Sequence, residues 1–353
     1  MSTEGERGQH ALRLAVGVAI AFWVPIVLDW RLSFMLAIFT ILLLATMRQP
    51  PTVRQFLGFT VVFGLATEAA LIASVVLRGT PAGLVLSTGV ALFLALRASA
   101  RGKAALPIML TLIAFTAMPF AVISAQDVAP YLQPMLVGAG AGAFAMAWLA
   151  HFLFPTHAPA PQTARAAADP GVDRSELGER DAVRKALCAT MVLLGAEIFA
   201  LLSTLPSRFV IVMTVVSIAQ HYARAGSTQV AIGLLVANVI GGIVATVAYE
   251  MLCAVPSPTM LALVTLLAGL VFGRFAAAAG ARAPLVAPAF ISTIILLGQS
   301  LLPITDDAAQ SFINRLVAVL VAAVIACVGL VLLDALTQPR RSPRKLGRLS
   351  PAS

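Results

Sequence analysis

Charge is what this sequence has least of. Only 11% of its 353 residues are Asp, Glu, Lys or Arg, whereas 60% are hydrophobic and the mean hydropathy is +0.96. A soluble globular domain is about one quarter charged, and a disordered chain is much poorer in apolar residues. The scarcity of charge therefore excludes both classes, and we expect an integral membrane protein.

The residues that build most enzyme sites are also scarce. The three cysteines, Cys188, Cys253 and Cys327, lie far apart in apolar runs, so no CxxC pair exists. No histidine has metal-ligand spacing, and no Walker lysine loop is present. The glycines from Gly138 to Gly142 lie inside an apolar run without a preceding strand, which favours close helix packing over dinucleotide binding. We therefore expect no enzyme activity, no cofactor and no metal ion.

Apolar runs recur along the chain at the length of membrane spans. A helix needs about 20 apolar residues to cross a bilayer, and these runs are apolar on nearly all sides, as lipid-buried helices are. The expected fold class is therefore an all-α polytopic membrane protein with about twelve transmembrane helices. The expected spans are 12–29, 32–47, 56–77, 81–97, 104–124, 131–154, 184–205, 208–223, 228–253, 258–275, 283–303 and 313–336.

The basic residues predict the orientation of these spans. With the N-terminus in the cytoplasm, all but four of the 24 Lys and Arg fall on the cytoplasmic side; the exceptions are Arg31, Arg78, Arg208 and Arg315. This asymmetry follows the positive-inside rule. It predicts a multi-pass membrane protein with both termini in the cytoplasm. The same rule explains the net charge of +9, which therefore does not indicate a nucleic acid partner.

A polar linker at 155–182 divides the spans six and six. We expect a first membrane repeat at 1–154, a second at 183–337, and a basic cytoplasmic tail at 338–353 that rests on anionic lipid. An even number of spans in each half makes both halves point the same way. The pattern predicts parallel internal repeats about an axis along the membrane normal, which is a known transporter plan.

Two glutamates, Glu68 and Glu197, fall near the middle of their expected spans. A carboxylate at the bilayer centre costs about 2.5–3.5 kcal/mol on insertion scales, and no Lys or Arg is expected at that depth. A carboxyl group that binds and releases protons there is what a proton-coupled transporter needs. The alternative is a neutral glutamic acid bonded to a neighbouring hydroxyl or carbonyl group. Glu250 lies closer to the outer edge, where an interfacial role is expected.

The second span of each half is short. Matching short segments in two repeats point to a transporter binding site. Thr40 in 32–47, and Thr214 and Ser217 in 208–223, are hydroxyl groups that could bind a carboxylate or ring hydroxyl of a substrate. The alternative is ordinary helix packing through small polar residues.

Three arginines, Arg31, Arg208 and Arg315, are expected on the outer side at span ends. A guanidinium group suits a carboxylate, so they could guide an anionic substrate outward, together with Asn314. The alternative is that the three side chains extend from span ends into the headgroup region.

The plan of six spans, a linker and six spans resembles the fusaric-acid-resistance and aromatic-acid-exporter-like (FUSC-like) family of inner-membrane transporters. The segments that carry the resemblance are Ala11–Arg54, with Trp30-Arg31 in a tight turn, Arg208–Gly233, and Asn314-Arg315-Leu316. The chain resembles a short member that lacks the large cytoplasmic domains. The resemblance implies efflux of aromatic and other organic acids, a homo-oligomer, and partnership with a periplasmic adaptor and an outer-membrane channel.

The sequence therefore favours a secondary active exporter of small organic acids, especially aromatic carboxylic acids or related toxic compounds, coupled to protons. Two alternatives stay open. One is a passive anion channel, because plant malate channels are distantly similar to the same family. The other is a membrane assembly subunit that transports nothing itself.

Overall fold

The computed structural model describes residues 3–28, 30, 34–47, 49–102, 105–124, 129–155, 179–203, 208–225, 229–278, 285–300 and 308–337. Nearly all of the expected linker and the whole basic tail therefore lie outside the described residues. The described residues form twelve α-helices and no strand. These are α1 (Thr3–Val27), α2 (Phe34–Thr46), α3 (Val53–Val76), α4 (Pro81–Ala100), α5 (Ala105–Ser124), α6 (Ala129–Leu153), α7 (Glu179–Leu202), α8 (Arg208–Ala225), α9 (Gln229–Ala254), α10 (Pro258–Ala278), α11 (Val286–Ser300) and α12 (Ala308–Thr337).

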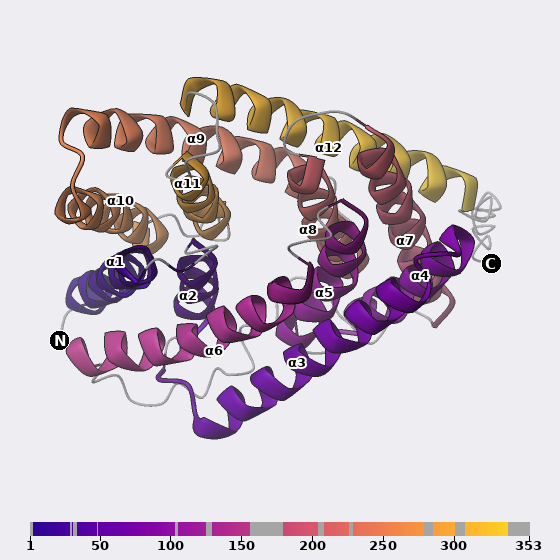
Figure 1. Cartoon of the computed structure of the whole chain (residues 1–353), viewed down its shortest axis with the longest axis horizontal. Helices are drawn as coiled ribbons and strands as arrows, with labels where there is room; N and C mark the ends of the chain where they lie inside the picture. Colours follow the sequence, from indigo (N-terminus) through magenta and orange to yellow (C-terminus); the bar gives the residue numbers. More distant parts are fainter. Residues whose placement is uncertain are drawn as a thin grey trace, which may run out of the picture.

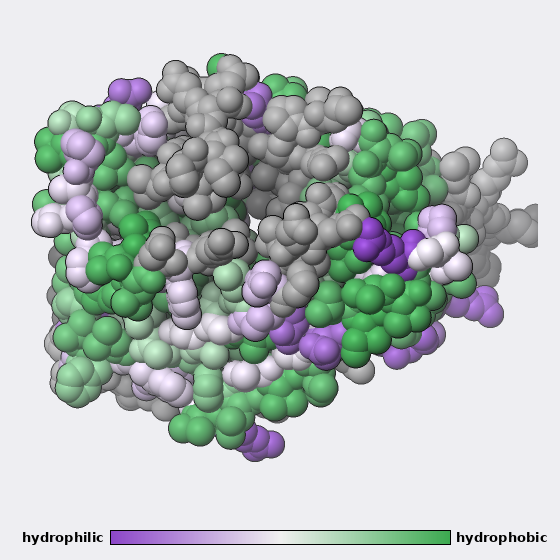
Figure 2. Space-filling model, viewed as in Figure 1, coloured by the Kyte–Doolittle hydropathy of each residue, from purple (hydrophilic) through white to green (hydrophobic). Residues whose placement is uncertain are grey.

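The expected fold class is confirmed. Among the described residues, seven helices are long and apolar enough to cross a membrane, namely α1, α3, α4, α6, α7, α9 and α10. The other five contain shorter apolar stretches. Most of the described surface in Figure 2 is correspondingly hydrophobic, with hydrophilic side chains in small separate patches. The protein is therefore a polytopic helical membrane protein.

Local sequence signals explain where several helices begin. Thr52 caps α3: its Oγ1 accepts a hydrogen bond from the Gln55 backbone N–H, and the Gln55 side chain accepts one from the Thr52 N–H. This reciprocal pair is a capping box, which satisfies backbone donors at a helix start. Pro81 and Pro258 begin α4 and α10 at the position where proline costs no helical hydrogen bond. Equivalent helices of the two halves thus begin with the same signal.

Helix packing repeats between the two halves. In the first half, α2 lies against α1 and α6, α3 lies against α5 and α6, and α4 lies against α5. Every one of these pairs recurs six helices later in the second half. Figure 1 shows α3 and α6 along one edge and α9 and α12 along the opposite edge, as expected for halves related by half a turn about the viewing direction. The helix packing of the first half therefore recurs in the second half, and the parallel orientation of the two repeats in a membrane stays a prediction.

The most extensive contact between two helices joins the two halves. α1 runs along α10, α4 along α7, α2 touches α11 and α5 touches α8. A Cβ atom added to Gly269 would lie 2.6 Å from the Cα of Ala15, and one added to Gly273 would lie 2.7 Å from the Cα of Ala11. These four small residues let the two backbones approach. Their pairing makes α1 and α10 antiparallel, as the expected topology requires, and it interlocks the halves.

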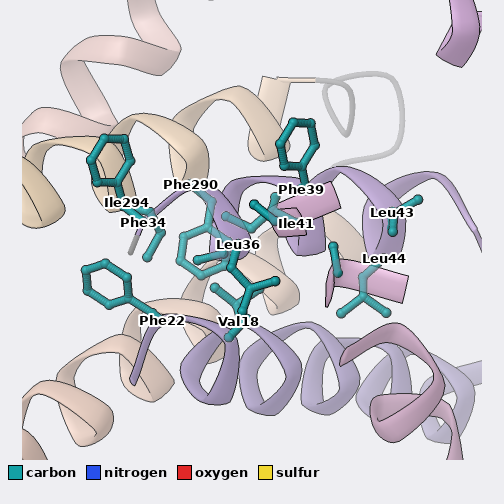
Figure 3. Close-up of a cluster of buried hydrophobic side chains, with 14 of the residues drawn as sticks. Val18, Phe22, Phe34, Leu36, Phe39, Ile41, Leu43, Leu44, Phe290 and Ile294 are labelled. Atoms are coloured by element: carbon teal, nitrogen blue, oxygen red, sulfur yellow. The ribbon is translucent and has the colours of Figure 1, made fainter. Parts of the chain in front are cut away.

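Two hydrophobic cores fill the protein, and both contain helices of both halves. One core combines side chains of α1, α2 and α6 mainly with those of α9, α10 and α11, and the other combines α7, α8 and α12 with α4 and α5. Figure 3 shows Phe22 of α1, Leu36 of α2 and Phe290 of α11 in the first core. Large side chains from distant segments therefore hold the short helix α2 in place.

Polar contacts join helix ends that the expected topology puts on the cytoplasmic side. Arg97 and Arg101, at the end of α4, both pair with Glu179 at the start of α7, with 2.5 Å between Arg97 Nη2 and Glu179 Oε1. The indole N–H of Trp148, near the end of α6, donates to the carbonyl of Pro51 just before α3, at 2.6 Å. The two exposed ion pairs tie one half of the protein to the other.

Candidate functional site

Glu197 is the one acidic residue among the described residues whose side chain is buried. It lies on α7 at 5% exposure, and its Oε2 atom has no hydrogen-bond partner within the described structure. Leu193 and Ala200, one turn away on each side, are fully buried in the core that α7 forms with α4, α8 and α12. A buried carboxylate without a partner is much less stable than one in water. Glu197 therefore stands apart from the other described acidic residues as a buried carboxyl group with an unsatisfied oxygen.

Glu68 lies in a different environment. It is exposed on α3, in a row with Val61, Leu65 and Ile72, while Phe63 on the opposite face of the helix is buried against neighbouring helices. The structure therefore does not bring together the two glutamates that were expected to couple protons. Glu68 faces away from the protein interior, and its role in coupling stays a prediction. Glu250 is exposed near the end of α9, as an interfacial role requires.

The mid-span hydroxyl groups are largely used inside their own helices. Thr40 is fully buried, and its Oγ1 donates to the carbonyl of Leu36 at 2.8 Å. Ser217 is partly buried and donates to the carbonyl of Met213 at 3.2 Å. Such bonds to the preceding turn are typical of hydroxyl side chains in helix interiors. For Thr40 the structure therefore favours helix packing over substrate binding, whereas Thr214 is partly exposed on α8.

The two short helices that were expected near a binding site are interior helices. α2 has 13 residues, three fewer than the expected span 32–47. α8 has 18 residues, two more than the expected span 208–223. They lie on opposite sides of the centre of the molecule in Figure 1, each in contact with helices of both halves. No described residue from 34 to 44 on α2, or from 211 to 223 on α8, is fully exposed. Both helices nevertheless carry partly exposed side chains. The partly exposed residues are Met35, Ile38 and Leu42 on α2, and Met213, Thr214 and Ser217 on α8.

The outer arginines fall largely outside what the structure describes. Arg31 is not among the described residues, and Arg208 and Arg315 belong to α8 and α12 without a described side chain. Asn314 is partly exposed near the start of α12. Their proposed contact with an anionic substrate stays a prediction.

Sequence reasoning did not identify Ser292, Thr293 and Gly241 as parts of a polar contact between α9 and α11. Ser292 Oγ donates to Asn238 Oδ1 at 3.0 Å, and Thr293 Oγ1 donates to the carbonyl of Gly241, also at 3.0 Å. A Cβ atom on Gly241 would lie 2.3 Å from the carbonyl oxygen of Ala289. Small and hydroxyl residues within two spans are the signal that could have found this contact.

Small residues of α6 do pack closely, as expected. A Cβ atom on Gly140 would lie 2.6 Å from the ring of Phe59, and one on Gly142 would lie 2.9 Å from Leu36, whereas Gly138 has open space. The contact of Gly269 and Gly273 with α1 differs because the nearest atoms are backbone Cα atoms and not a side chain. Its signal was the G-x-x-x-G spacing in an apolar run.

An apolar groove of about 450 Å³ lies between α7 and α12. Gly195 and Phe199 line it from α7, and both are exposed, whereas Glu197 between them is buried. Side chains two residues apart point to opposite faces of a helix. The groove therefore lies on the far side of α7 from the buried carboxyl group. Among the described residues, no three His, Cys, Asp or Glu side chains could hold a metal ion together.

Comparison with known proteins gives one match. Residues 10–150, which span nearly all of the first six helices, match a family described as "Protein of unknown function (DUF2955)". No curated protein and no solved structure matches the chain. The resemblance to the fusaric-acid-resistance family stays a prediction. The protein is thus a helical membrane protein whose described residues form twelve helices with a repeated packing pattern, and its residues 10–150 are similar to this family of unknown function.

Proposed function

We propose that the protein is a proton-driven secondary exporter of small organic acids, with aromatic carboxylic acids as the leading class. The observation that carries the proposal is the buried carboxyl group of Glu197, which has no described partner for Oε2 and lies where helices of the two repeats meet. Intramembrane acids in that setting are typical of proton relays in transporters. The inner membrane, with both termini in the cytoplasm, is part of the proposal.

The packing around Glu197 supports a link between proton exchange and movement of the halves. α7 belongs to the second repeat, and α4, which runs along it, belongs to the first. Transporters with internal repeats move one half against the other around a central site. A shift of α4 against α7 would change the access of water to Glu197. Proton uptake or release would then accompany the change in access.

The interior helices α2 and α8 support an organic acid as the substrate. Their partly exposed side chains are mostly apolar, with Thr214 and Ser217 as hydroxyl groups on α8. Small-molecule sites combine an apolar lining with few polar groups, which fits an aromatic ring with one carboxylate. The proposal includes a periplasmic adaptor and an outer-membrane channel as partners, on the resemblance stated above.

Uptake of labelled aromatic carboxylic acids into everted membrane vesicles tests the function. We expect wild-type uptake to be lost when an uncoupler is added, and Glu197→Gln to abolish it, because glutamine cannot exchange a proton. Glu68→Gln serves as the second variant. Loss of uptake in Glu68→Gln but not in Glu197→Gln would contradict the assignment to Glu197. Uptake that persists with the uncoupler would indicate a passive channel, and no uptake by inserted protein would indicate an assembly subunit.

The hydroxyl groups of α2 and α8 are expected to differ in their effect on transport. Thr40→Val should change the KM of uptake by less than about twofold, because the Thr40 hydroxyl already donates to its own helix and the site is fully buried. Thr214→Val should raise KM about tenfold or more when Thr214 contacts the carboxylate, since a hydrogen bond to a charged group is worth about 1.5–3 kcal/mol. Initial rates over a range of substrate concentrations measure both. Equal KM values for the two variants would contradict substrate contact by Thr214.

A further inference from the structure

Two helix contacts that join the repeats are counterparts of each other. α1 of the first repeat runs along α10 of the second, and α7 of the second repeat runs along α4 of the first. Figure 1 places the α1–α10 contact and the α4–α7 contact at opposite ends of the molecule. An exact repeat would make the two contacts alike, so a difference between them points to a difference in role.

The two contacts differ in the residues that α10 and α4 supply. On α10 these are Gly269 and Gly273, which let the backbone of α1 approach. Counted from the proline that opens each helix, Leu92 and Leu96 take their places on α4. Both leucines are fully buried in the core that α4 shares with α7. The α1–α10 contact is therefore backbone against backbone, whereas large side chains fill the corresponding positions of α4.

The facing helices α1 and α7 do not account for this difference. Counted from the arginine near the start of each span, Ala182 and Ala186 on α7 take the places of the two alanines of α1 that meet the glycines of α10. At Gly89 of α4, the atom nearest to an added Cβ atom is Cδ1 of Leu194 on α7, at 2.9 Å. At this point α4 therefore meets a movable side chain of α7, and not its backbone.

Leucine differs from alanine and glycine in how it responds when two helices shift. A leucine side chain has two torsions that can move to another staggered position, whereas alanine and glycine have no such freedom. Small sliding movements of packed helices are one of the ways in which domains close and open. A shift at the α1–α10 contact would lose backbone contacts that no side chain can replace. α4 can shift along α7 while its leucine side chains repack.

The repeat does not extend to the ion pairs of Glu179. This residue, at the start of α7, pairs with Arg97 and Arg101 at the end of α4. At the corresponding end of the α1–α10 contact, Gly8 takes the place of Glu179 and Ala278 that of Arg101. The three paired side chains are between 33% and 56% exposed. Exposed ion pairs contribute little to stability, so water can replace these pairs at small cost.

We propose that the two repeats pivot about the α1–α10 contact and separate between α4 and α7 at the end expected in the cytoplasm, where the ion pairs of Glu179 hold the closed state. Transporters with internal repeats move largely as rigid bodies. A small rotation at α1–α10 therefore gives a larger displacement at the opposite end of the molecule. Glu197 lies on α7, so the movement alters the packing around its carboxyl group. The proposal rests on the proposed function for the purpose of the movement, which itself is measured without transport.

Distances between spin labels across each contact test the pivot. In a background without the three native cysteines, labels are attached to Leu94→Cys and Leu187→Cys across α4–α7, or to Val271→Cys and Leu12→Cys across α1–α10. All four side chains are exposed in the native protein. Double electron–electron resonance in lipid nanodiscs gives both distance distributions. We expect Glu179→Lys to add a longer-distance population across α4–α7 and to leave the α1–α10 distribution unchanged.

A charge exchange separates loss of the ion pairs from general damage. Glu179→Lys combined with Arg97→Glu restores one pair with inverted signs, so we expect the short-distance population across α4–α7 to return. Arg274→Glu, at the place of Arg97 on α10, serves as the matched control and should change neither distribution. A longer distance across α1–α10, no change across α4–α7 in Glu179→Lys, or no return in the exchanged variant would overturn the proposal.

Cross-linking connects the movement with transport. The same two pairs of cysteines are joined by a bifunctional reagent that contains a reducible disulfide, and uptake of labelled aromatic carboxylic acids is measured in vesicles. We expect the α4–α7 link to abolish uptake until it is reduced, and the α1–α10 link to leave most of the uptake. Loss of uptake with the α1–α10 link would contradict the pivot. No uptake by the wild-type protein would contradict the proposed function, while the label distances still decide where the repeats separate.

Discussion

Substitution of leucine for Gly269 is expected to remove most of the folded protein from the membrane. A single Cβ atom at this position would lie 2.6 Å from the Cα of Ala15 and 3.0 Å from its Cβ, so the obstacle is backbone and not a movable side chain. The contact belongs to the α1–α10 packing that joins the halves. Overpacking a well-filled site costs about 1–3 kcal/mol and sometimes more, which is a large part of the stability of a typical protein.

A matched pair of alanine variants tests the close approach of α1 and α10 with a smaller change in side-chain size. Gly269→Ala should lower the melting temperature, because its methyl group meets backbone. Gly138→Ala on α6 should raise it or leave it unchanged, since no atom lies within 4 Å of the added Cβ atom and alanine favours a helix by up to about 1 kcal/mol. Thermal unfolding of the purified protein, with size-exclusion profiles for Gly269→Leu, measures these effects. Shifts in the same direction for both alanine variants would contradict the close α1–α10 approach.

Substitution of leucine for Glu197 is expected to stabilise the protein and abolish transport together. An unsatisfied buried polar group costs about 1–3 kcal/mol, and exchange of buried charged groups for apolar residues of similar volume is often neutral or stabilising. Leu193 and Ala200 on both sides already form an apolar, fully buried environment. We expect the melting temperature to rise by a few degrees, since about 1 kcal/mol corresponds to about 2–4 °C in domains of 150–250 residues. Uncoupler-sensitive uptake should disappear in the same variant.

The opposite exchange one turn away serves as the control. Leu193→Glu places a second carboxyl group in the same core and should lower the melting temperature by several degrees. Both variants are compared with wild type in one thermal unfolding assay, and uptake is measured in vesicles that contain equal amounts of inserted protein. A lower melting temperature for Glu197→Leu would mean that the carboxyl group is satisfied in the folded protein, and it would remove the main support for proton coupling at this residue.

The expected spans were close to the helices because span length and helix starts are local properties. The expected spans 81–97 and 258–275 begin where α4 and α10 begin, since Pro81 and Pro258 open both helices. The short run 32–47 corresponds to α2, which ends at Thr46. An unbroken apolar run, ended by charge or proline, needs no tertiary information to be recognised as a span. The even number of expected spans in each half predicts parallel repeats, and the recurring helix packing shows the repeat itself.

Which side of each helix faces inward could not be read from the same runs. Glu68 and Glu197 look alike in sequence, because both stand near the middle of apolar spans that have no polar face to show direction. The structure buries one and exposes the other. Thr40 was likewise a candidate for substrate binding from its position in a short span. In the structure its hydroxyl group donates a hydrogen bond within α2. In lipid the outer face of a helix is as apolar as its inner face, so hydrophobic periodicity loses its meaning.

Fold class was thus determined by the sequence alone, through the length of the apolar runs. Twelve spans with both termini in the cytoplasm stay predictions from the apolar runs and the placement of Lys and Arg. The partners of each helix were decided only by the tertiary structure. Gly269 and Gly273 meet Ala15 and Ala11 across more than 250 residues of chain because small side chains let two backbones come close. That choice depends on the shapes of both surfaces. The same packing decided that Glu197 lies among helices of both halves and that Glu68 faces out.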